Sequence, residues 1–296
     1  MRGWGSRSPL ADFVLSGGVS QKNEVTEVAK MKGTIGFIGC GNMAKAMLGG
    51  IIAEKLTDKD ALMASAKSEQ TIRQAAEQFG IRTTVDNREV ASFADILILA
   101  VKPVYMEEVI REIRDVVNET KVVVTLAPGK TLAWLKETFG KDVKLVRTMP
   151  NTPAAVGAGM TALCPSENVG EADLKTVTEI FSSFGEAEIV TENMIDVVTG
   201  VSGSSPAYVF MFIEALADAA VHDGMPRKQA YKFAAQTVLG SAKMVLETGK
   251  HPGELKDMVC SPGGTTIEAV RVLEKEGMRS AVMEAVKACI EKARGI

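Results

Sequence analysis

The stretch Thr34-Ile35-Gly36-Phe37-Ile38-Gly39-Cys40-Gly41-Asn42-Met43-Ala44 decides the fold class of this chain. Residues 34–39 are a short apolar run that ends in glycine, which predicts a buried strand. Apolar residues then recur at helical spacing over residues 43–55, which predicts a helix directly after that strand. The residues between the two elements fit the pattern G-x-G-x-x-[GA]. The stretch therefore predicts a loop that binds the pyrophosphate of a dinucleotide.

The small residues of this loop each have a physical task in that interpretation. Gly39 permits the tight turn, Gly41 lets a pyrophosphate approach the backbone, and Ala44 permits close packing of the helix on the strand. The alternative is a strand–helix turn of the same shape that binds no ligand. The residues that we expect to contact a cofactor here are Gly39, Cys40, Gly41, Asn42, Met43 and Ala44.

Strands and helices alternate from this loop to about residue 146. The run over residues 95–101 is apolar on both faces, as a central parallel strand must be. Alternation of this kind predicts an α/β domain with a doubly wound parallel sheet of the Rossmann type. The further strands are predicted over 61–65, 83–85, 122–126 and 143–146, and the further helices over 69–79, 106–117 and 132–139.

The pattern changes after about residue 190, where strand signals end and long helical stretches follow. The segment 206–221 is apolar on almost every side, so a helix there must be covered all round. We expect a second subunit to cover it, although a central core helix in a monomer is the alternative. The predicted organisation is a disordered extension over 1–30, an NAD(P)-binding Rossmann domain over 31–190 and an all-helical substrate-binding and dimerisation domain over 191–296. The helices expected there cover 206–223, 227–248, 266–274 and 278–294.

Composition excludes several classes of function. The 296 residues carry a formal net charge of −3, which argues against a general binder of nucleic acids or anionic membranes. No uncharged apolar run reaches about 18 residues, so no transmembrane helix is expected. The 4 cysteines are far apart in the sequence and there are only 2 histidines, so metal-ligand spacing is absent. Reduced thiols in a cytoplasmic protein are the simplest interpretation.

The end of the second predicted strand indicates which cofactor is used. Enzymes that use NAD usually place an acid there to bind the ribose hydroxyls. This chain has Ser65-Ala66-Lys67-Ser68 instead, with no acid before Glu69. Two hydroxyls and a cation suit a 2′-phosphate, which favours NADPH. The alternative is a solvated helix start with Ser68 as its N-cap.

A second cofactor segment is predicted where the central strand ends, at Ala100-Val101-Lys102-Pro103. The carboxyl ends of strands at this position border the cofactor in doubly wound sheets. Pro103 ends the strand, and Lys102 would be the only charge there. A structural cap of the next helix is the alternative role for these residues.

The segment Asp257-Met258-Val259-Cys260-Ser261-Pro262-Gly263-Gly264-Thr265-Thr266 is built to hold a small anion beside a hydroxyl. Gly263 and Gly264 let the backbone come close to a ligand. A helix begins at Thr265 and Thr266, and the free N–H groups of its first turn favour a carboxylate or phosphate. The alternative is an ordinary Gly-Pro turn with Thr as the N-cap.

The remaining chemistry points to hydride transfer. A Gly-x-Ser-x-Gly elbow does not occur, which disfavours a serine hydrolase. His251 is predicted at a helix start and His222 at a helix end, so neither is assigned as an acid or base. Without a metal site or an activated nucleophile, a bound cofactor is expected to carry the difficult step.

Together these segments resemble the pyrroline-5-carboxylate reductase family, from about Lys32 to the C-terminus. That family reduces 1-pyrroline-5-carboxylate to L-proline with NAD(P)H, the last step of proline biosynthesis. The resemblance implies a Rossmann domain, an all-helical dimer-forming domain and a homodimer. Many members assemble further into rings of dimers, so a decamer of dimers is a further expectation. The segments that carry the resemblance are Phe37–Ala44, Ala100–Pro103, Asn151–Pro153, Gly203–Tyr208, His251–Asp257 and Ser261–Thr266.

The resemblance also implies roles for individual residues. Residues 39–44 would hold the pyrophosphate, and Ser65 and Lys67 would lie near the 2′-phosphate. Asn87 would contact the cofactor, and Val101 and Lys102 would border the nicotinamide ribose. NADH remains an alternative hydride donor, because residues 65–67 vary widely in the family.

On the substrate side, the resemblance places the carboxylate on the amides of residues 263–266, beside Ser261. The substrate-binding set that it implies is Ser261, Gly263, Gly264, Thr265, Thr266 and Glu192. Thr266 is the implied catalytic residue, whose hydroxyl meets the imine nitrogen, and Glu192 is a substrate-side acid. The chain departs from the family at Ser205, where Gly is frequent, and at Met258, where Asn is frequent.

Two other functions are compatible with these patterns. A different NADP-dependent imine reductase or a β-hydroxyacid dehydrogenase would share the sheet and the helical domain. The latter would need a Lys or Asp acid in the helical part, for which Lys243 is the nearest candidate. An NADP-binding regulator would use Cys40 or Cys260 as a redox switch and show no turnover. In each case the expected protein is cytoplasmic, with neither nucleic acid nor membrane as a partner.

Overall fold

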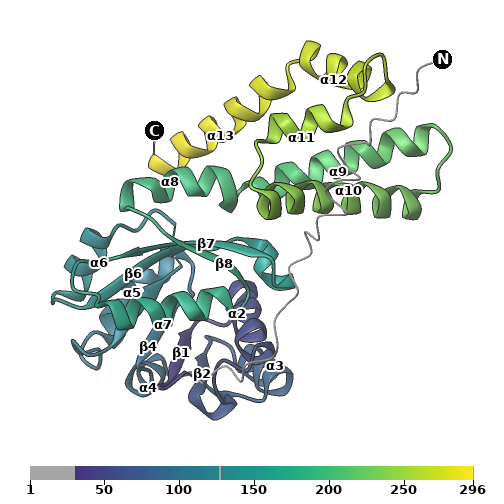
Figure 1. Ribbon diagram of the computed structural model, residues 1–296. Coiled ribbons are helices and arrows are strands. Elements are labelled where there is room, and N and C mark those ends of the chain that lie inside the picture. Colours follow the sequence, from purple (N-terminus) through teal and green to yellow (C-terminus); the bar gives the residue numbers. More distant parts are fainter. Residues whose placement is uncertain (1–30, 127, 296) are drawn as a thin grey trace. The chain divides into compact units, whose positions relative to one another are not determined.

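The computed structural model describes residues 31–126 and 128–295, and the extension predicted over 1–30 lies outside them. The described chain forms two compact units (Figure 1). The α/β unit comprises residues 31–207 and 286–295, and the helical unit comprises residues 208–285. This division falls inside a helix, and the domain boundary near residue 190 stays a prediction.

The α/β unit is built on an eight-stranded sheet with the order β3-β2-β1-β4-β5-β6-β7-β8. The strands from β3 to β6 in this order are parallel, and Ile35 in β1 pairs with Leu62 in β2 and Ile96 in β4. β7 runs antiparallel to β6, and β8 runs parallel to β7. The strands are β1 Ile35–Ile38, β2 Leu62–Ser65, β3 Arg82–Thr84, β4 Ile96–Leu99, β5 Val122–Thr125, β6 Lys144–Met149, β7 Gly159–Pro165 and β8 Gly185–Ile189.

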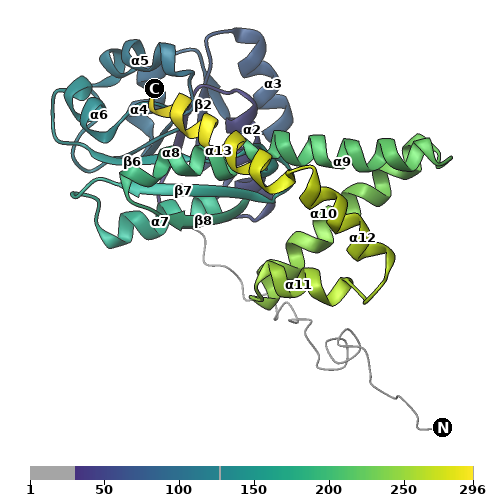
Figure 2. The same ribbon diagram turned by 90° about the horizontal axis from the view of Figure 1, so that it is seen from above.

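Helices cover both faces of this sheet, as a doubly wound fold requires. One face packs Phe37, Ile98 and their neighbours against α2, α3 and α7, and the other packs Ile38 and Leu97 against α4, α5 and α6. Figure 2 shows α5 and α6 on the opposite side of the strands from α7. The Rossmann fold predicted from the sequence is therefore confirmed. The helices are α2 Asn42–Ala53, α3 Glu69–Phe79, α4 Asn87–Phe93, α5 Met106–Ile113, α6 Leu132–Phe139 and α7 Glu171–Ser182.

Local chemistry fixes where several of these helices begin and end. The Ser68 hydroxyl accepts a hydrogen bond from the Thr71 amide, so Ser68 is the N-cap of α3 as its sequence position suggested. Gly80 follows α3 in the left-handed conformation with φ +67°, which a residue with a Cβ adopts only at a cost. Thr131 caps α6 by accepting from the Trp134 amide.

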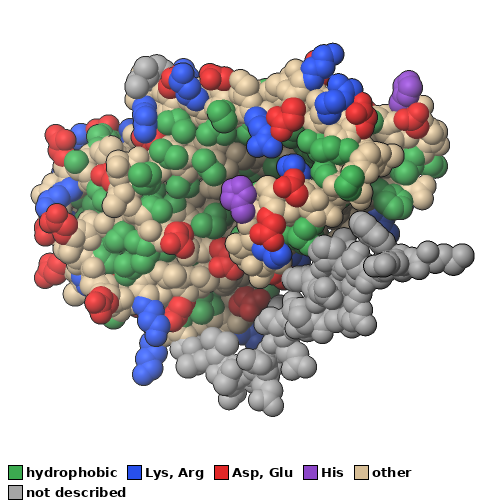
Figure 3. All heavy atoms as spheres, turned by 45° about the horizontal axis from the view of Figure 1, so that its top comes forward, with side chains coloured by type: hydrophobic (Ala, Val, Ile, Leu, Met, Phe, Trp, Pro, Cys, Tyr) green, Lys and Arg blue, Asp and Glu red, His purple; other side chains and the backbone are tan. Residues whose placement is uncertain are grey.

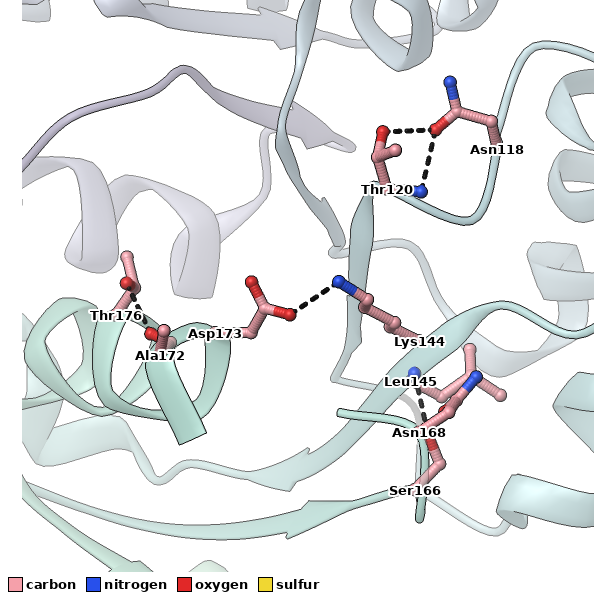
Figure 4. A network of polar contacts seen from close by, with 9 residues as sticks. All are labelled: Asn118, Thr120, Lys144, Leu145, Ser166, Asn168, Ala172, Asp173 and Thr176. Atoms are coloured by element: carbon pink, nitrogen blue, oxygen red, sulfur yellow. Dashed lines mark hydrogen bonds and ion pairs between the residues drawn. The ribbon is translucent and has the colours of Figure 1, made fainter. Parts of the chain in front are cut away.

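The sequence patterns did not predict β7, α7 or β8. Polar contacts attach α7 and the end of β7 to β6, and β8 pairs with β7 (Figure 4). Lys144 Nζ in β6 lies 2.7 Å from Asp173 Oδ2 in α7, and the Leu145 amide donates to Ser166 Oγ just after β7. The sheet therefore continues beyond the parallel strands into an antiparallel extension.

The helical unit contains most of α9, all of α10, α11 and α12, and residues 278–285 of α13. α9 and α10 pack together through Ala217, Ala230 and Ala234, whose small side chains allow a close approach (Figure 1). The helices are α9 Ser205–His222, α10 Arg227–Thr248, α11 Pro252–Val259, α12 Thr265–Lys275 and α13 Met278–Arg294. In the α/β unit α9 is preceded by η4 Glu192–Met194, α8 Ile195–Val198 and the π-helix η5 Thr199–Gly203.

Large apolar side chains of the helical unit are exposed in the single chain. Phe210 and Met211 on α9 are 63% and 68% exposed, and Phe233 on α10 is 59% exposed. The space-filling view in Figure 3 shows such apolar side chains gathered in patches between charged ones. These faces need a cover that the single chain does not supply.

The helical run Glu192–His222 is long and apolar enough to cross a membrane by length and composition, with a mean hydropathy of 1.2. The sequence predicts no transmembrane helix because charged residues interrupt the apolar run. Of the most apolar window of this run, 6% is buried in the single chain. Length and composition alone are therefore compatible with either lipid or another protein surface covering α9.

Candidate active site

The loop between β1 and α2 is held tightly against the ends of two neighbouring strands. Gly39 has φ +96°, and a Cβ at this position would lie 2.8 Å from the carbonyl oxygen of Ala100. The Gly39 amide donates to the carbonyl of Ser65 over 3.0 Å, and the Ala100 amide donates to that of Ile38 over 2.8 Å. Because β2 and β4 both end against this loop, only glycine fits position 39 without a shift of the backbone.

The first turn of α2 offers uncapped backbone amides to an anion. Its N-cap, Gly41, makes no side-chain cap hydrogen bond, and the first turn carries no acidic residue. A Cβ at Gly41 would meet no atom within 4 Å, so the backbone there borders open space. Ala44 is 1% exposed and packs on the sheet. This arrangement fits a pyrophosphate, because the free N–H groups and the helix dipole both favour negative charge.

A cleft with a volume of about 540 Å³ opens beside this loop. It is bordered by the ends of β1, β2 and β4 and by α5. The predicted cofactor residues that line it are Gly39, Cys40, Gly41, Lys67, Asn87, Val101 and Lys102. Its other lining residues are Ala66, Thr71, Val85, Tyr105, Glu108, Val109 and Glu112. The structure thus brings together three sequence segments that were assigned to one cofactor separately.

The other predicted cofactor residues lie around this cleft without lining it. Asn42 and Met43 line a second cavity of about 470 Å³, together with Lys45, Gln78 and Thr152 among others. Pro103 begins the short 3-10 helix η2, Pro103–Tyr105. Lys102 occupies the N-cap position of η2 but makes no side-chain cap hydrogen bond, so its side chain is not used as a cap.

Ser65 was expected to lie near the 2′-phosphate, but its side chain points into the protein and contacts Asn87. Its side chain is fully buried, and its hydroxyl donates to Asn87 Oδ1 over 2.7 Å. Asn87 Nδ2 in turn donates to Glu112 Oε2 over 2.8 Å. Ser65 therefore contacts another predicted cofactor residue, and Lys67 is the polar side chain of this segment that lines the cleft.

Tyr105 and Glu112 line the cleft and were missed in the sequence. The Lys67 ammonium lies 5.6 Å from the centre of the Tyr105 ring, within the range of a cation–π contact. The signal that identifies these residues is helical spacing, because Tyr105, Glu108, Val109 and Glu112 follow the i, i+3, i+4, i+7 pattern of a single helix face. That pattern shows a shared face but not what the face borders.

The two thiols considered as switches have different surroundings. Burial raises the pKa of the Cys40 thiol, and the nearby Lys45 ammonium only partly offsets this. A thiol with a raised pKa is protonated at neutral pH and is a poor nucleophile. Cys260 is half-buried after α11, and both thiols are free. The surroundings of Cys40 do not favour a redox role.

The loop before α12 forms a second place for an anion, within the helical unit. Gly263 has φ +67°, and the Gly264 amide donates to the Ser261 carbonyl over 3.0 Å. Gly264 is the N-cap of α12 and makes no side-chain cap hydrogen bond, so neither Thr265 nor Thr266 caps this helix. The first-turn amides remain for a ligand, and the Thr266 side chain, half-buried in the first turn, lies beside them.

Glu192 is engaged in an ion-pair network inside the α/β unit. Its Oε1 atom lies 3.0 Å from Nη1 of Arg147 and accepts from the Leu132 amide over 2.7 Å. Arg147 is 4% exposed and also lies 3.6 Å from Asp196. The geometry shows Glu192 joining η4 to β6 and α6, and its predicted substrate contact stays a prediction.

The residues considered for other chemistries are used structurally. His251 Nδ1 accepts from the Gly253 amide over 3.1 Å, so His251 caps α11. Lys243 forms an exposed i,i+4 pair with Glu247, as on any solvated helix face. Ser205 donates to the Gly200 carbonyl over 2.9 Å. Within residues 31–126 and 128–295, no three His, Cys, Asp or Glu side chains are grouped to hold a metal ion.

Two family models match the chain. The model described as "Pyrroline-5-carboxylate reductase dimerisation" matches residues 192–296, and the one described as "NADP oxidoreductase coenzyme F420-dependent" matches residues 34–129. The first match includes α9 to α13, whose apolar faces are exposed. The second includes the loop of residues 39–44 and the end of β4.

Curated relatives match this chain over nearly their whole length. The chain is 57% identical to the pyrroline-5-carboxylate reductase of Escherichia coli (strain K12) over 263 residues, which are 89% of this chain and 98% of that protein. It is 44% identical to the pyrroline-5-carboxylate reductase of Methanosarcina acetivorans over 260 residues, which are 88% of this chain and 96% of that protein.

Solved structures agree with these matches. A pyrroline-5-carboxylate reductase from Coxiella burnetii superposes with a TM-score of 0.85 at 37% identity, covering 90% of this chain and 98% of that one. The pyrroline carboxylate reductase of Plasmodium falciparum with NADP bound superposes with a TM-score of 0.80 at 33% identity, covering 90% and 99%.

Proposed function

The chain belongs to the pyrroline-5-carboxylate reductase family, and from this premise we propose that it reduces 1-pyrroline-5-carboxylate to L-proline with NADPH. This is the last step of proline biosynthesis. The observation that carries the proposal is the uncapped first turn of α12 behind Gly263 and Gly264. It offers a carboxylate site in the same chain as a dinucleotide cradle, and a reductase of a small imino acid needs both.

The α/β unit is proposed to hold the cofactor in the cleft beside Gly39. The amides at the start of α2 would bind the pyrophosphate, and the Lys67 ammonium would bind the 2′-phosphate. Val101 and Lys102 would border the nicotinamide ribose at the end of β4. When bound, NADPH supplies the hydride that reduces the C=N bond. The open space at Gly41 supports binding of a dinucleotide pyrophosphate, and the cation at Lys67 supports NADPH over NADH as the donor.

The helical unit is proposed to orient the substrate. The amides of residues 263–266 would bind its carboxylate, beside Ser261. The Thr266 hydroxyl would donate a hydrogen bond to the imine nitrogen and orient it. Threonine is a poor acid, so solvent or prior protonation of the imine would supply the proton. General-acid assistance is typically worth about 10²–10⁴ in rate, and a positioning hydroxyl accounts for less than that.

The protein forms a dimer through the region matched by the dimerisation model, residues 192–296. We propose that a second copy covers α9, in place of lipid, because the exposed apolar residues lie within this matched region. Assembly into a decamer of dimers and a cytoplasmic location, without membrane or nucleic acid as a partner, are proposed on the same family membership.

The test is the oxidation of NADPH in the presence of 1-pyrroline-5-carboxylate, with NADH run in parallel and proline identified as product. Rapid oxidation with stoichiometric proline is expected, with NADPH preferred. If NADPH binds but this imine is not reduced, a panel of other cyclic imines and β-hydroxyacids will test the related reductase functions. Binding without turnover of any of them, together with a change of assembly after thiol blocking, would favour the regulator.

A further inference from the structure

Glu112 lies on α5 and lines the cofactor cleft, and nothing above assigns it a role. It contacts the first turn of α4 at two points. Its side-chain Oε2 accepts from Asn87 Nδ2 over 2.8 Å, and its main-chain carbonyl accepts from Arg88 Nη1 over 2.6 Å. α5 is therefore attached to α4 at the residue that family membership places next to the cofactor.

The amide of Asn87 is held from both sides. Its Oδ1 accepts from the buried Ser65 hydroxyl, and its Nδ2 donates to Glu112. An amide nitrogen carries two N–H groups, so one remains after the bond to Glu112. That second N–H has no hydrogen-bond partner in the part of the chain that the structure describes. Because Asn87 lines the cleft, a ligand with an acceptor oxygen can use it.

The two neighbours of Asn87 do not constrain the amide equally. A serine hydroxyl can donate or accept, so Ser65 tolerates either orientation of the amide. A carboxylate only accepts, so Glu112 tolerates the orientation in which Nδ2 faces it. A flipped amide would place Oδ1 against the Glu112 carboxylate and lose a charge-assisted hydrogen bond. Glu112 is thus the group that decides which end of Asn87 is offered to the cleft.

We propose that Glu112 is a positioning residue for dinucleotide binding. It holds Asn87 so that an amide N–H, and not the carbonyl oxygen, faces a ribose-hydroxyl or phosphate oxygen of the cofactor. The inference rests on the proposed function only in taking the cleft to bind NADPH. A direct action of the carboxylate on the phosphates would have the opposite sign, because it would repel them, so removal of its charge would then tighten binding.

The experiment is a double-mutant cycle on binding of NADPH, measured by fluorescence titration, and of NADP⁺, measured by calorimetry. Glu112→Gln keeps the size of the side chain but can donate as well as accept, so the Asn87 amide is free to flip. We expect Glu112→Gln to raise Kd about three- to tenfold and Asn87→Ala to raise it at least as much. In the Asn87→Ala background, Glu112→Gln should change Kd by less than about twofold, because its effect passes through Asn87.

Glu107→Gln is the matched control, because this substitution removes the same charge from the same helix. Glu107 pairs with Arg111 outside the cleft. The Kd of this control should equal that of the wild type, and both glutamine variants should keep the wild-type melting temperature. Asn87→Ala should lower the melting temperature, because it leaves the buried Ser65 hydroxyl without its acceptor. The titrations are therefore made at a temperature at which every variant is folded. Tighter binding of NADPH by Glu112→Gln, or an equal effect with and without Asn87, would overturn the proposal. In turnover, Glu112→Gln should raise KM for NADPH and leave kcat at saturation unchanged.

The binding cycle does not depend on substrate turnover. A wild type that binds NADPH but fails to reduce the imine would contradict the proposed function and leave the cycle readable. A wild type that is active but shows no coupling between Glu112 and Asn87 would contradict this inference alone.

Discussion

Glu192 Oε1 lies 3.0 Å from Nη1 of Arg147, whose side chain is 4% exposed on β6. The same oxygen accepts the Leu132 amide at the start of α6. A nearly buried guanidinium needs such partners, because an unpaired charge in this position would carry a large desolvation cost. Glu192 therefore joins the helical run that leads to α9 to β6 and to the start of α6.

Replacement of Glu192 by alanine is expected to lower the free energy of unfolding by about 1–3 kcal/mol. The cost is moderated because Asp196 remains 3.6 Å from Arg147. Urea denaturation of the two single variants will measure it, with Asp196→Asn expected to cost less than Glu192→Ala. If Glu192→Ala instead keeps full stability and raises KM for the imine, its role as a substrate-side acid prevails.

Gly39 and Gly41 lie two residues apart but should respond to alanine in opposite ways. At Gly39, positive φ and the approach of the Ala100 carbonyl predict a loss of about 2–4 kcal/mol of stability. At Gly41 the added methyl group meets open space at a φ of −82°, so folding should be unaffected. The methyl group would instead occupy the pyrophosphate cradle.

Thermal unfolding and NADPH titration on both glycine variants will check this pair. Gly41→Ala should keep the wild-type melting temperature and lower the affinity for NADPH at least about tenfold, which is about 1.4 kcal/mol of binding free energy. Gly41→Ala with normal affinity for NADPH would show that the pyrophosphate does not approach this backbone.

Lys67→Ala is expected to lower the affinity for NADPH about 10- to 100-fold and to leave the affinity for NADH within about twofold. The reason is that only NADPH carries the 2′-phosphate that pairs with an ammonium. The preference of the wild type for NADPH over NADH should shrink as the salt concentration rises. Lys175→Ala on α7 is the control, since Lys175 is 80% exposed and lies outside the lining of the cleft. Equal losses for NADPH and NADH would assign Lys67 to a general role in folding or in pyrophosphate binding.

Much of the α/β unit follows from local patterns, because each parallel strand is buried on both faces and therefore appears as a continuous apolar run. β1, β4 and β5 are of this kind, and their predicted ranges agree with the structure to within a few residues. β8 is different. It is an edge strand with the sequence Gly-Glu-Ala-Glu-Ile and exposed glutamates, so no apolar run marks it.

The candidate site was predictable where backbone chemistry defines it and less so where packing does. Gly39, Gly41 and Gly264 follow from the geometry of turns and helix N-termini. Glu112 and the burial of Ser65 do not, because they depend on how α5 lies against the ends of β2 and α4. Helical spacing shows that Glu112 shares a face with Tyr105, but only the tertiary structure shows that this face borders the cleft.

Thr266→Ala should lower kcat/KM for the imine about 10- to 100-fold, at or below the lower end of general-acid assistance, because this hydroxyl orients the nitrogen without supplying its proton. The affinity for NADPH should stay within about twofold of the wild type, because Thr266 lies in the helical unit and the dinucleotide cradle in the α/β unit. Thr237→Ala is a suitable control, since that exposed hydroxyl donates to the Phe233 carbonyl of its own helix. Unchanged turnover in Thr266→Ala would remove this hydroxyl from the mechanism.

Phe210→Glu should convert the dimer to monomer in light-scattering measurements of mass. Phe210 is 63% exposed on α9 in the single chain, and burial of a phenylalanine is worth about 1.5–3 kcal/mol. In a twofold interface each substitution acts twice, and each glutamate would be buried without a partner. Gln229→Glu adds the same charge at an exposed polar position of α10 and should remain dimeric. An unchanged mass for Phe210→Glu would place the interface elsewhere, and flotation of the wild type with lipid vesicles would show that lipid, and not a second copy, covers α9.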